Sequence, residues 1–256
     1  GIREERGIDF VTANGENLAG GMGLTVGTAE ILLESGVDVM TSGNHIWDKK
    51  EILALLDSEP RLLRPANYPA GAPGSGSYLA RTEAGRPVGV VNVMGRVFMP
   101  SLDDPFATVL REVEQLRRHT RIVVVDVHAE ATSEKLAMGW HLDGKETAVL
   151  GTHTHVQAAD DQTLPGGTGY LTDVGMTGPH DSIIGMDRAG ALERFLTGMP
   201  VKLETASGGV RLNAVLVTAD EATGRALSVD RLNLTAAEVE QGDFVVGAAP
   251  QSAGYR

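Results

Sequence analysis

Four short apolar segments are each followed by side chains that can bind a metal ion. These following stretches are Asn14-Gly15-Glu16-Asn17, Ser42-Gly43-Asn44-His45, His128 and Gly151-Thr152-His153-Thr154-His155. Imidazole nitrogens and carboxylate or amide oxygens are suitable ligands for divalent Fe, Mn and Zn. A carboxylate such as Glu16 can bridge two such ions about 3.5–4 Å apart, a separation that clamps a phosphoryl group. The pattern predicts a metal centre suited to phosphate esters.

His153 and His155 are separated by a single residue. In an extended chain, side chains alternate with a period of two, so both rings would point to the same side. The pair could then bind one ion, or one each of two neighbouring ions. Taken alone, this pair could equally be a surface or core pair, and His128 could be a packed core residue. Four of the seven histidines follow predicted strands, however, and this joint pattern favours a metal centre.

The elements that must position these residues follow a βαβ rhythm. Apolar segments predict strands at 8–13, 37–41, 87–93, 122–127, 147–150 and 168–171, and helical spacing predicts helices at 25–34, 49–56 and 105–119. This alternation indicates an α/β protein with a mostly parallel sheet, in which ligands gather at the carboxyl ends of the strands. After Pro200, predicted strands at 201–204, 210–218 and 226–232 indicate an antiparallel section.

Composition narrows the function classes. The 256 residues include 22 Lys plus Arg against 34 Asp plus Glu, which gives a formal charge of −12, and there is no cysteine. The charge argues against binding bulk nucleic acid through a basic surface, and the lack of cysteine excludes disulfides and thiol catalysis. No run reaches the roughly 18 apolar residues of a membrane span. We expect one domain over 1–235, a C-terminal tail over 236–256 and a cytoplasmic location.

Several motifs together resemble a known family. Gly43-Asn44-His45, His128 and the stretch 151–155 resemble the signature of the calcineurin-like metallophosphoesterases. The stretches 14–17, 128–135 and 177–185 resemble its YmdB-type bacterial branch more narrowly. The resemblance covers residues 1 to about 235. It implies a four-layer α/β/β/α sandwich with mixed sheets, and metal-dependent hydrolysis of small phosphodiesters, with 2′,3′-cyclic nucleotides as the substrate class.

The resemblance also implies roles for individual residues and a centre of two divalent ions, Fe, Mn or Zn. The implied metal ligands are Glu16, Asn17, Asn44, His128, His153 and His155. Glu16 is similar to the bridging carboxylate, in place of the Asp usual in the wider superfamily. His155 and Asn17 would belong to the second ion. A metal-bound hydroxide would attack the phosphorus, and His45 is similar to the proton donor for the leaving oxygen.

Family members open with a strand that ends in a Gly-Asp-x-x-Gly motif, whose Asp binds the second ion. Gly1 to Arg6 resembles the end of the helix after that strand, so we expect the strand to lie before residue 1 and the second site to lack one ligand.

We weigh two other functions: a non-catalytic metal- or nucleotide-binding regulator, and an amidohydrolase-type enzyme, which the late position of the His-X-His pair disfavours. The stretch 177–182 could equally face substrate or merely connect two elements. The sequence leaves metal identity, natural substrate and oligomeric state open, a homo-oligomer included.

Overall fold

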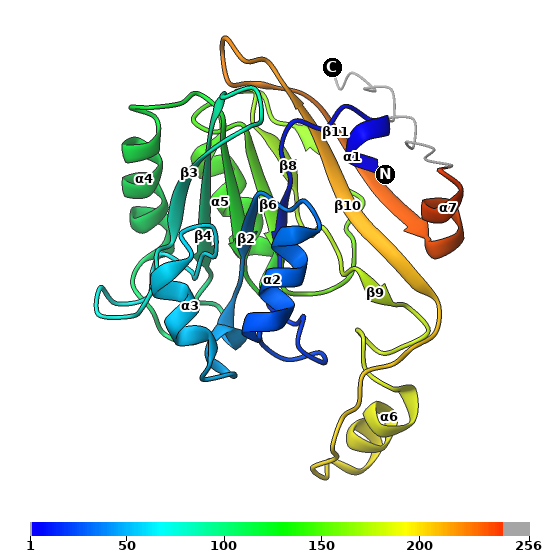
Figure 1. Ribbon diagram of the computed structural model, residues 1–256. Helices are drawn as coiled ribbons and strands as arrows, with labels where there is room; N and C mark the ends of the chain where they lie inside the picture. The colour runs from blue at the N-terminus through cyan, green and yellow to red at the C-terminus, as the bar shows by residue number, and fades with distance from the viewer. Residues whose placement is uncertain (1, 243–256) are drawn as a thin grey trace, which may run out of the picture.

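A six-stranded sheet forms the centre of the molecule in the computed structural model, which describes residues 2–242 (Figure 1). Its strand order is β3-β4-β5-β6-β8-β7. The strands are β3 (Ser77–Arg81), β4 (Pro87–Met94), β5 (Val123–His128), β6 (Ala148–Thr152), β7 (Gln162–Thr163) and β8 (Gly169–Leu171). The four central strands are parallel, and the two edge strands β3 and β7 are antiparallel to their neighbours. The register pairs His128 with Thr152, so the carboxyl ends of β5 and β6 are level.

Two smaller sheets complete the β structure. Strands β1 (Thr12–Asn14) and β2 (Val39–Thr41) form a parallel pair, and β9 (Gly178–Pro179), β10 (Val210–Ala219) and β11 (Ala226–Thr235) form an antiparallel sheet. The predicted antiparallel section is therefore confirmed for β10 and β11. Val215 of β10 packs against the buried cluster that contains Leu171 of β8, and Val39 of β2 belongs to the same buried cluster as Val90 of β4. Both smaller sheets thus lie against the central sheet.

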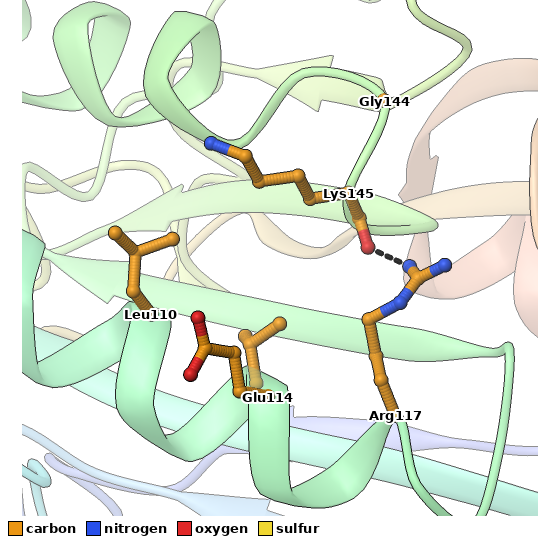
Figure 2. A pocket seen from close by; sticks show the side chains of 6 residues that line it. Leu110, Glu114, Arg117, Gly144 and Lys145 are labelled. Atoms are coloured by element: carbon orange, nitrogen blue, oxygen red, sulfur yellow. Dashed lines mark hydrogen bonds between the residues drawn. The ribbon is translucent and has the colours of Figure 1, made fainter.

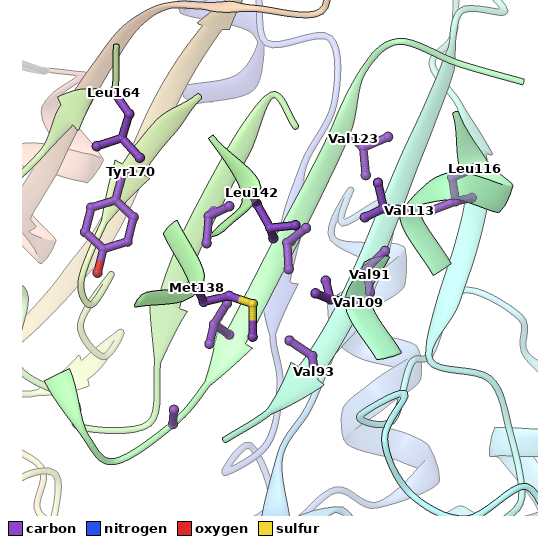
Figure 3. Close-up of a cluster of buried hydrophobic side chains, with 14 residues drawn as sticks. Val91, Val93, Val109, Val113, Leu116, Val123, Met138, Leu142, Leu164 and Tyr170 are labelled. Carbon is purple, nitrogen blue, oxygen red and sulfur yellow. The ribbon is translucent and has the colours of Figure 1, made fainter. Parts of the chain in front are cut away.

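Helices α4 (Pro105–Leu116) and α5 (Thr132–Leu142) cover the other face of the central sheet (Figure 3). The chain forms α4 because Asp104 accepts hydrogen bonds from the first free backbone N–H groups and Pro105 suits the first helical position. Val109 and Val113 are one helical turn apart and face the β-branched side chains of β4 and β5. Burial of this stripe anchors the strands that end at the functional site.

A third group of short helices packs against β2. It comprises α2 (Val26–Glu34), the 3₁₀ helix η1 (Asn44–Trp47) and α3 (Ile52–Ser58). Thr25 caps α2 with its hydroxyl, which agrees with the helix predicted over 25–34. Ile46 is fully buried in a cluster with Met40 of β2 and Ile52 of α3. This buried anchor fixes the turn that carries Asn44 and His45.

One predicted strand is wrong. Residues 201–204 form no strand; they return irregularly from helix α6 (Arg188–Thr197), which was not predicted from the sequence. A side chain at Gly190 would touch Val201 and Leu203, so this segment packs on α6 instead of pairing with a sheet. Figure 1 shows α6 projecting away from the three sheets. Strand β3 was also not predicted, because Gly and Ser residues precede it.

The ends of the described chain carry two further helices. Helix α1 (Ile2–Glu5) agrees with the expected helix end. Helix α7 (Ala236–Gln241) begins the stretch that we assigned to a tail, and residues 243–256 lie outside the described part. Among residues 2–242, no helix has both the length and the apolar character needed to cross a bilayer.

A surface hollow of about 380 Å³ lies between α4 and the turn that precedes β6 (Figure 2). Arg117 donates a hydrogen bond to the backbone carbonyl of Lys145 at this hollow. The next residue, Glu146, is only 3% exposed, and neither of its carboxyl oxygens has a hydrogen-bond partner within the described residues. Burial raises the pKa of Glu146 to about 8, although the positive charges of Arg117 and Lys145 oppose the shift. This acid lies outside the predicted site.

Candidate metal centre

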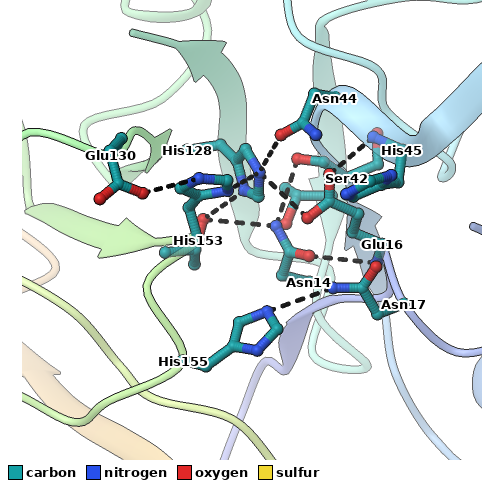
Figure 4. Close-up of polar contacts among 12 residues, drawn as sticks. Asn14, Glu16, Asn17, Ser42, Asn44, His45, His128, Glu130, His153 and His155 are labelled. Carbon is teal, nitrogen blue, oxygen red and sulfur yellow. Dashed lines mark hydrogen bonds and ion pairs between the residues drawn. The ribbon is translucent and has the colours of Figure 1, made fainter. Parts of the chain in front are cut away.

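Four of the predicted ligands lie close together: the side chains of Glu16, Asn44 and His153 surround the Nε2 atom of the fourth, His128 (Figure 4). Glu16 Oε2 lies 3.0 Å from it, and both Asn44 Oδ1 and His153 Nδ1 lie 3.1 Å from it. Ligand atoms of Glu16, His128 and His153 all lie within 4.8 Å of one another. These side chains come from the loop after β1, from η1, from the end of β5 and from the loop after β6. The carboxyl ends of separate strands therefore deliver the donors to one point, as predicted.

The hydrogen bonds behind His128 assign its tautomer. Nδ1 of His128 lies 3.0 Å from Thr152 Oγ1, and that hydroxyl donates its hydrogen to Asp126 Oδ1 at 2.7 Å. Thr152 must then accept from His128, so the ring carries its hydrogen on Nδ1 and presents a lone pair at Nε2. Lone pairs of an imidazole, a carboxylate and an amide oxygen would repel one another unless they share a cation. The donor set therefore fits a divalent ion.

Asp126 supports this arrangement and was not predicted. It lies on the same face of β5 as Val124 and His128. We had interpreted this β-branched segment only as a buried strand. Its carboxylate accepts hydrogen bonds from Asn14 at 2.9 Å, from Thr41 at 2.5 Å and from Thr152. Burial raises the pKa of Asp126, and these three donors oppose the shift. An acid within an otherwise apolar strand was the available signal.

The charges at the cluster suit metal binding. Glu16 is 2% exposed, and burial by itself would raise its pKa. The neighbouring ring of His128 and the hydrogen bond from the backbone N–H of His45 outweigh burial, so the pKa of Glu16 lies below its ordinary value. Burial, followed by the neighbouring His128, lowers the pKa of His153 and favours the neutral ring that binds metals. His153 Nε2 also lies 3.1 Å from Glu130 Oε2.

The expected extended conformation of the His-X-His pair is wrong. Strand β6 ends at Thr152, and His153 and His155 have left-handed φ angles of 96° and 66°. The rings therefore separate: His153 faces His128, whereas His155 Nε2 lies 3.2 Å from Asn17 Nδ2. His155 Nδ1 donates to the carbonyl of Ile184 at 2.9 Å, which leaves the lone pair on Nε2 facing Asn17.

A buried ion pair accounts for this backbone. Lys135 Nζ lies 2.7 Å from Asp173 Oδ2 and 2.9 Å from the carbonyl oxygen of Thr152. Asp173 Oδ2 also accepts from the backbone N–H and the hydroxyl of Thr154, at 3.1 and 2.6 Å. The pair thereby fixes the chain on both sides of His153. Lys135 ends the family-like stretch 128–135, but the sequence assigned no role to it, and Asp173 lies outside the stretches that resemble the family.

Glycine is required at two positions of the site because neighbouring atoms approach the backbone too closely for a Cβ atom. A Cβ atom on Gly43 would lie 2.1 Å from His128 Nε2, and one on Gly151 would lie 1.8 Å from the carbonyl oxygen of Thr172. Both distances are far below a van der Waals contact. No other residue leaves space at these positions for the ring of His128 and the turn after β6.

The remaining predicted residues lie at the edge of the cluster. His45 donates its backbone N–H to Glu16 Oε1 at 2.8 Å, and its ring Nδ1 lies 2.8 Å from Asp48 Oδ2. Asn17 contacts His155, and Asn17 Oδ1 is a buried oxygen with no hydrogen-bond partner in the described part of the chain. The structure therefore brings all seven predicted side chains into one region, with Asn17 and His155 beside the four-donor cluster and His45 next to Glu16.

Comparisons with known proteins identify the family to which the chain belongs. A family model described as YmdB-like protein matches residues 1–232. The chain is 48% identical, over 87% of its length and 84% of the relative, to a Bacillus subtilis protein described as 2′,3′-cyclic-nucleotide 2′-phosphodiesterase. The crystal structure of a hypothetical protein from Thermus thermophilus matches with a TM-score of 0.85 and 46% identity, over 91% of this chain and 90% of that one. A novel phosphatase from Mycoplasma pneumoniae matches with a TM-score of 0.84 and 32% identity, over 91% and 85%.

Proposed function

Because the chain belongs to the YmdB-like family, we propose that it is a metal-dependent phosphodiesterase that hydrolyses 2′,3′-cyclic nucleotides. Family membership confirms the resemblance deduced from the motifs. The phosphodiesterase class is confirmed by the activity named for the Bacillus subtilis relative. The observation that carries the proposal is the convergence of Glu16, Asn44, His128 and His153 on one point, with the Nε2 lone pair of His128 turned inward.

These four side chains would hold one divalent ion. Asn17 and His155 would contribute to a second, because the amide of Asn17 lies beside the lone pair of His155 and its oxygen has no other partner in the described chain. Glu16 would link the two, although its Oε1 already accepts a hydrogen bond from His45. Bound divalent ions supply positive charge to a phosphoryl group and make water a nucleophile at neutral pH. Fe, Mn and Zn all suit these donors.

His45 is the proposed proton donor to the leaving oxygen. Asp48 accepts from Nδ1 of this ring and so fixes its orientation, which leaves Nε2 as the atom that would carry the transferred proton. The backbone N–H of His45 also binds Glu16. One residue thus holds both the carboxylate of the metal centre and the acid next to it.

The test compares the wild-type chain with His45→Ala, using 2′,3′-cyclic AMP and added Mn²⁺. We expect turnover to fall by about 10²–10⁴-fold, as is usual when a general acid is removed, with Mn²⁺ binding retained. Undiminished turnover would remove His45 from its role. Mn²⁺ binding by the wild-type chain without any phosphodiester turnover would favour the non-catalytic regulator.

We further propose the four-layer arrangement implied by the family. Helices α4 and α5 would be the first layer, the six-stranded sheet the second, the two smaller sheets the third, and α2 with α3 the fourth. The clusters that join α4 to β4, β10 to β8 and α2 to β2 support this order. One domain over 1–235, two metal ions and a cytoplasmic location remain predictions.

A further inference from the structure

A hollow of about 290 Å³ adjoins the metal centre at His155. Its apolar lining comes from Val156, Met176 and Ile184, and its polar lining includes His180 and Asn213. Ile184 links the two sites, because its carbonyl accepts the hydrogen bond that orients the ring of His155. A ligand whose phosphate lies at the metal centre could therefore extend directly into this hollow.

Two side chains that line the hollow each contain a buried polar atom without a partner within the described chain. Asn213 is only 6% exposed, and its Oδ1 makes no hydrogen bond. Its Nδ2 lies 3.3 Å from His180 Nε2, and the other ring nitrogen, His180 Nδ1, is likewise buried and unpartnered. Buried polar atoms nearly always have partners, so this pair indicates a ligand that supplies them.

The hydrogen bond between the two side chains determines what that ligand must offer. If His180 Nε2 accepts from the amide of Asn213, then His180 Nδ1 is a free donor and Asn213 Oδ1 is a free acceptor. If the amide is rotated and Nε2 donates instead, Nδ1 becomes the free acceptor and the amide nitrogen the free donor. In either state the pair presents one donor and one acceptor.

We propose that this hollow binds the nucleobase of the substrate, an inference that rests on the proposed function. Each of the four bases carries both donors and acceptors on its edge, so a base can supply a partner to an unpartnered atom of this pair in either state. The apolar side chains of Val156, Met176 and Ile184 suit the faces of a flat ring. Because the pair can reverse its polarity, the site requires a base but tolerates all four.

The experiment compares two substrates with the same cyclic phosphodiester. One is 2′,3′-cyclic AMP, and the other is methyl β-D-ribofuranoside 2′,3′-cyclic phosphate, which has no base. We expect Asn213→Leu and His180→Phe each to lower kcat/KM for 2′,3′-cyclic AMP about 10-fold and to leave the base-free substrate within about twofold of wild type. His141→Phe, in α5 and outside the hollow, is the matched control and should change neither.

A second readout separates this inference from the proposed function. Adenosine has no phosphate, and we expect saturation-transfer NMR to detect its binding to the wild-type chain but not to His180→Phe. Equal losses on both substrates, no loss on either, or unchanged adenosine binding would overturn the nucleobase site. If the wild type hydrolyses neither substrate yet binds adenosine through His180, the proposed function fails and the site stands. Thermal unfolding of each variant identifies a folding defect. If Asn213→Leu does not fold, the test rests on His180→Phe, because His180 is at a partly exposed position.

Discussion

Replacing Asp173 by Ala should weaken both the fold and the metal centre. Asp173 is 2% exposed, and its carboxylate accepts from Lys135, twice from Thr154 and once from the backbone N–H of Gly175. Removing one partner of a buried ion pair leaves an uncompensated charge and costs about 3–5 kcal/mol. Total stabilities are roughly 5–15 kcal/mol, so the loss is readily measured by chemical denaturation. Glu204→Ala, which breaks the exposed pair with Lys202, is the control and should cost less than about 1 kcal/mol.

The same substitution should reduce Mn²⁺ affinity, because Thr154 lies between the two histidines that have left-handed backbones. Such conformations cost about 1–3 kcal/mol each and persist only when their surroundings enforce them. Without Asp173, the segment should relax toward ordinary backbone angles and move the ring of His153 away from His128. Isothermal titration with Mn²⁺ should then show at least about tenfold weaker binding.

A double variant separates positioning from stability. Lys135→Met together with Asp173→Leu removes both buried charges, and replacing a buried pair by apolar side chains commonly restores stability. It does not restore the acceptor for Thr154, so we expect Mn²⁺ affinity to stay low. Recovery of Mn²⁺ affinity along with stability, or an Asp173→Ala variant that binds Mn²⁺ like the wild type, would refute the reasoning.

Three further substitutions test other parts of the structure. Gly43→Ala should displace the ring of His128 and weaken Mn²⁺ binding about tenfold or more in titration, whereas Gly27→Ala, with open space around it in α2, should leave binding unchanged. Thr152→Val removes the hydroxyl that assigns the tautomer of His128, and loss of such supporting groups costs about 10–100-fold in metal affinity; a smaller effect would argue against the assigned tautomer. The pKa of Glu146, raised to about 8, means that the folded state holds a proton that the unfolded state releases near pH 4.5, so stability should fall as pH rises from 5 to 8, by up to about 3–4 kcal/mol. Glu146→Gln should flatten this dependence in denaturation curves, and an equally steep curve in that variant would assign the pH dependence to other groups.

The donor residues of the site could be predicted from sequence because strands end where polar motifs begin. Strand β5 is a β-branched run, interrupted only by Asp126, that stops at His128, and β2 stops just before Ser42, Gly43 and Asn44. The parallel order then brings the carboxyl ends to one edge of the molecule. Helix α4 was predicted for the same kind of reason, since its apolar residues recur every three or four positions and Pro105 begins it.

Other elements could not be predicted because their stabilising contacts are not local. The segment 201–204 has the composition of a strand, but it packs on α6, whose own outer face is largely exposed. Helix α6 has weak local signals beyond the capping Asp187 and the terminal Gly198. The sequence does not show that the chain leaves the sheets at this point, so it favours a strand over an irregular segment for residues 201–204.

The orientation of the histidines depends on two carboxylates that no metal-binding motif would include. Asp126 acts through Thr152 to place the lone pair of His128, and Asp173 holds the backbone on which His153 and His155 diverge. Both acids are buried, and both reach the site by hydrogen bonds to a threonine next to a ligand. The register of β5 against β6 places Thr152 opposite His128, so the first of these contacts depends on sheet pairing and not on spacing in the sequence. A motif can therefore identify the donor atoms, while the direction in which each lone pair points is determined by the tertiary structure.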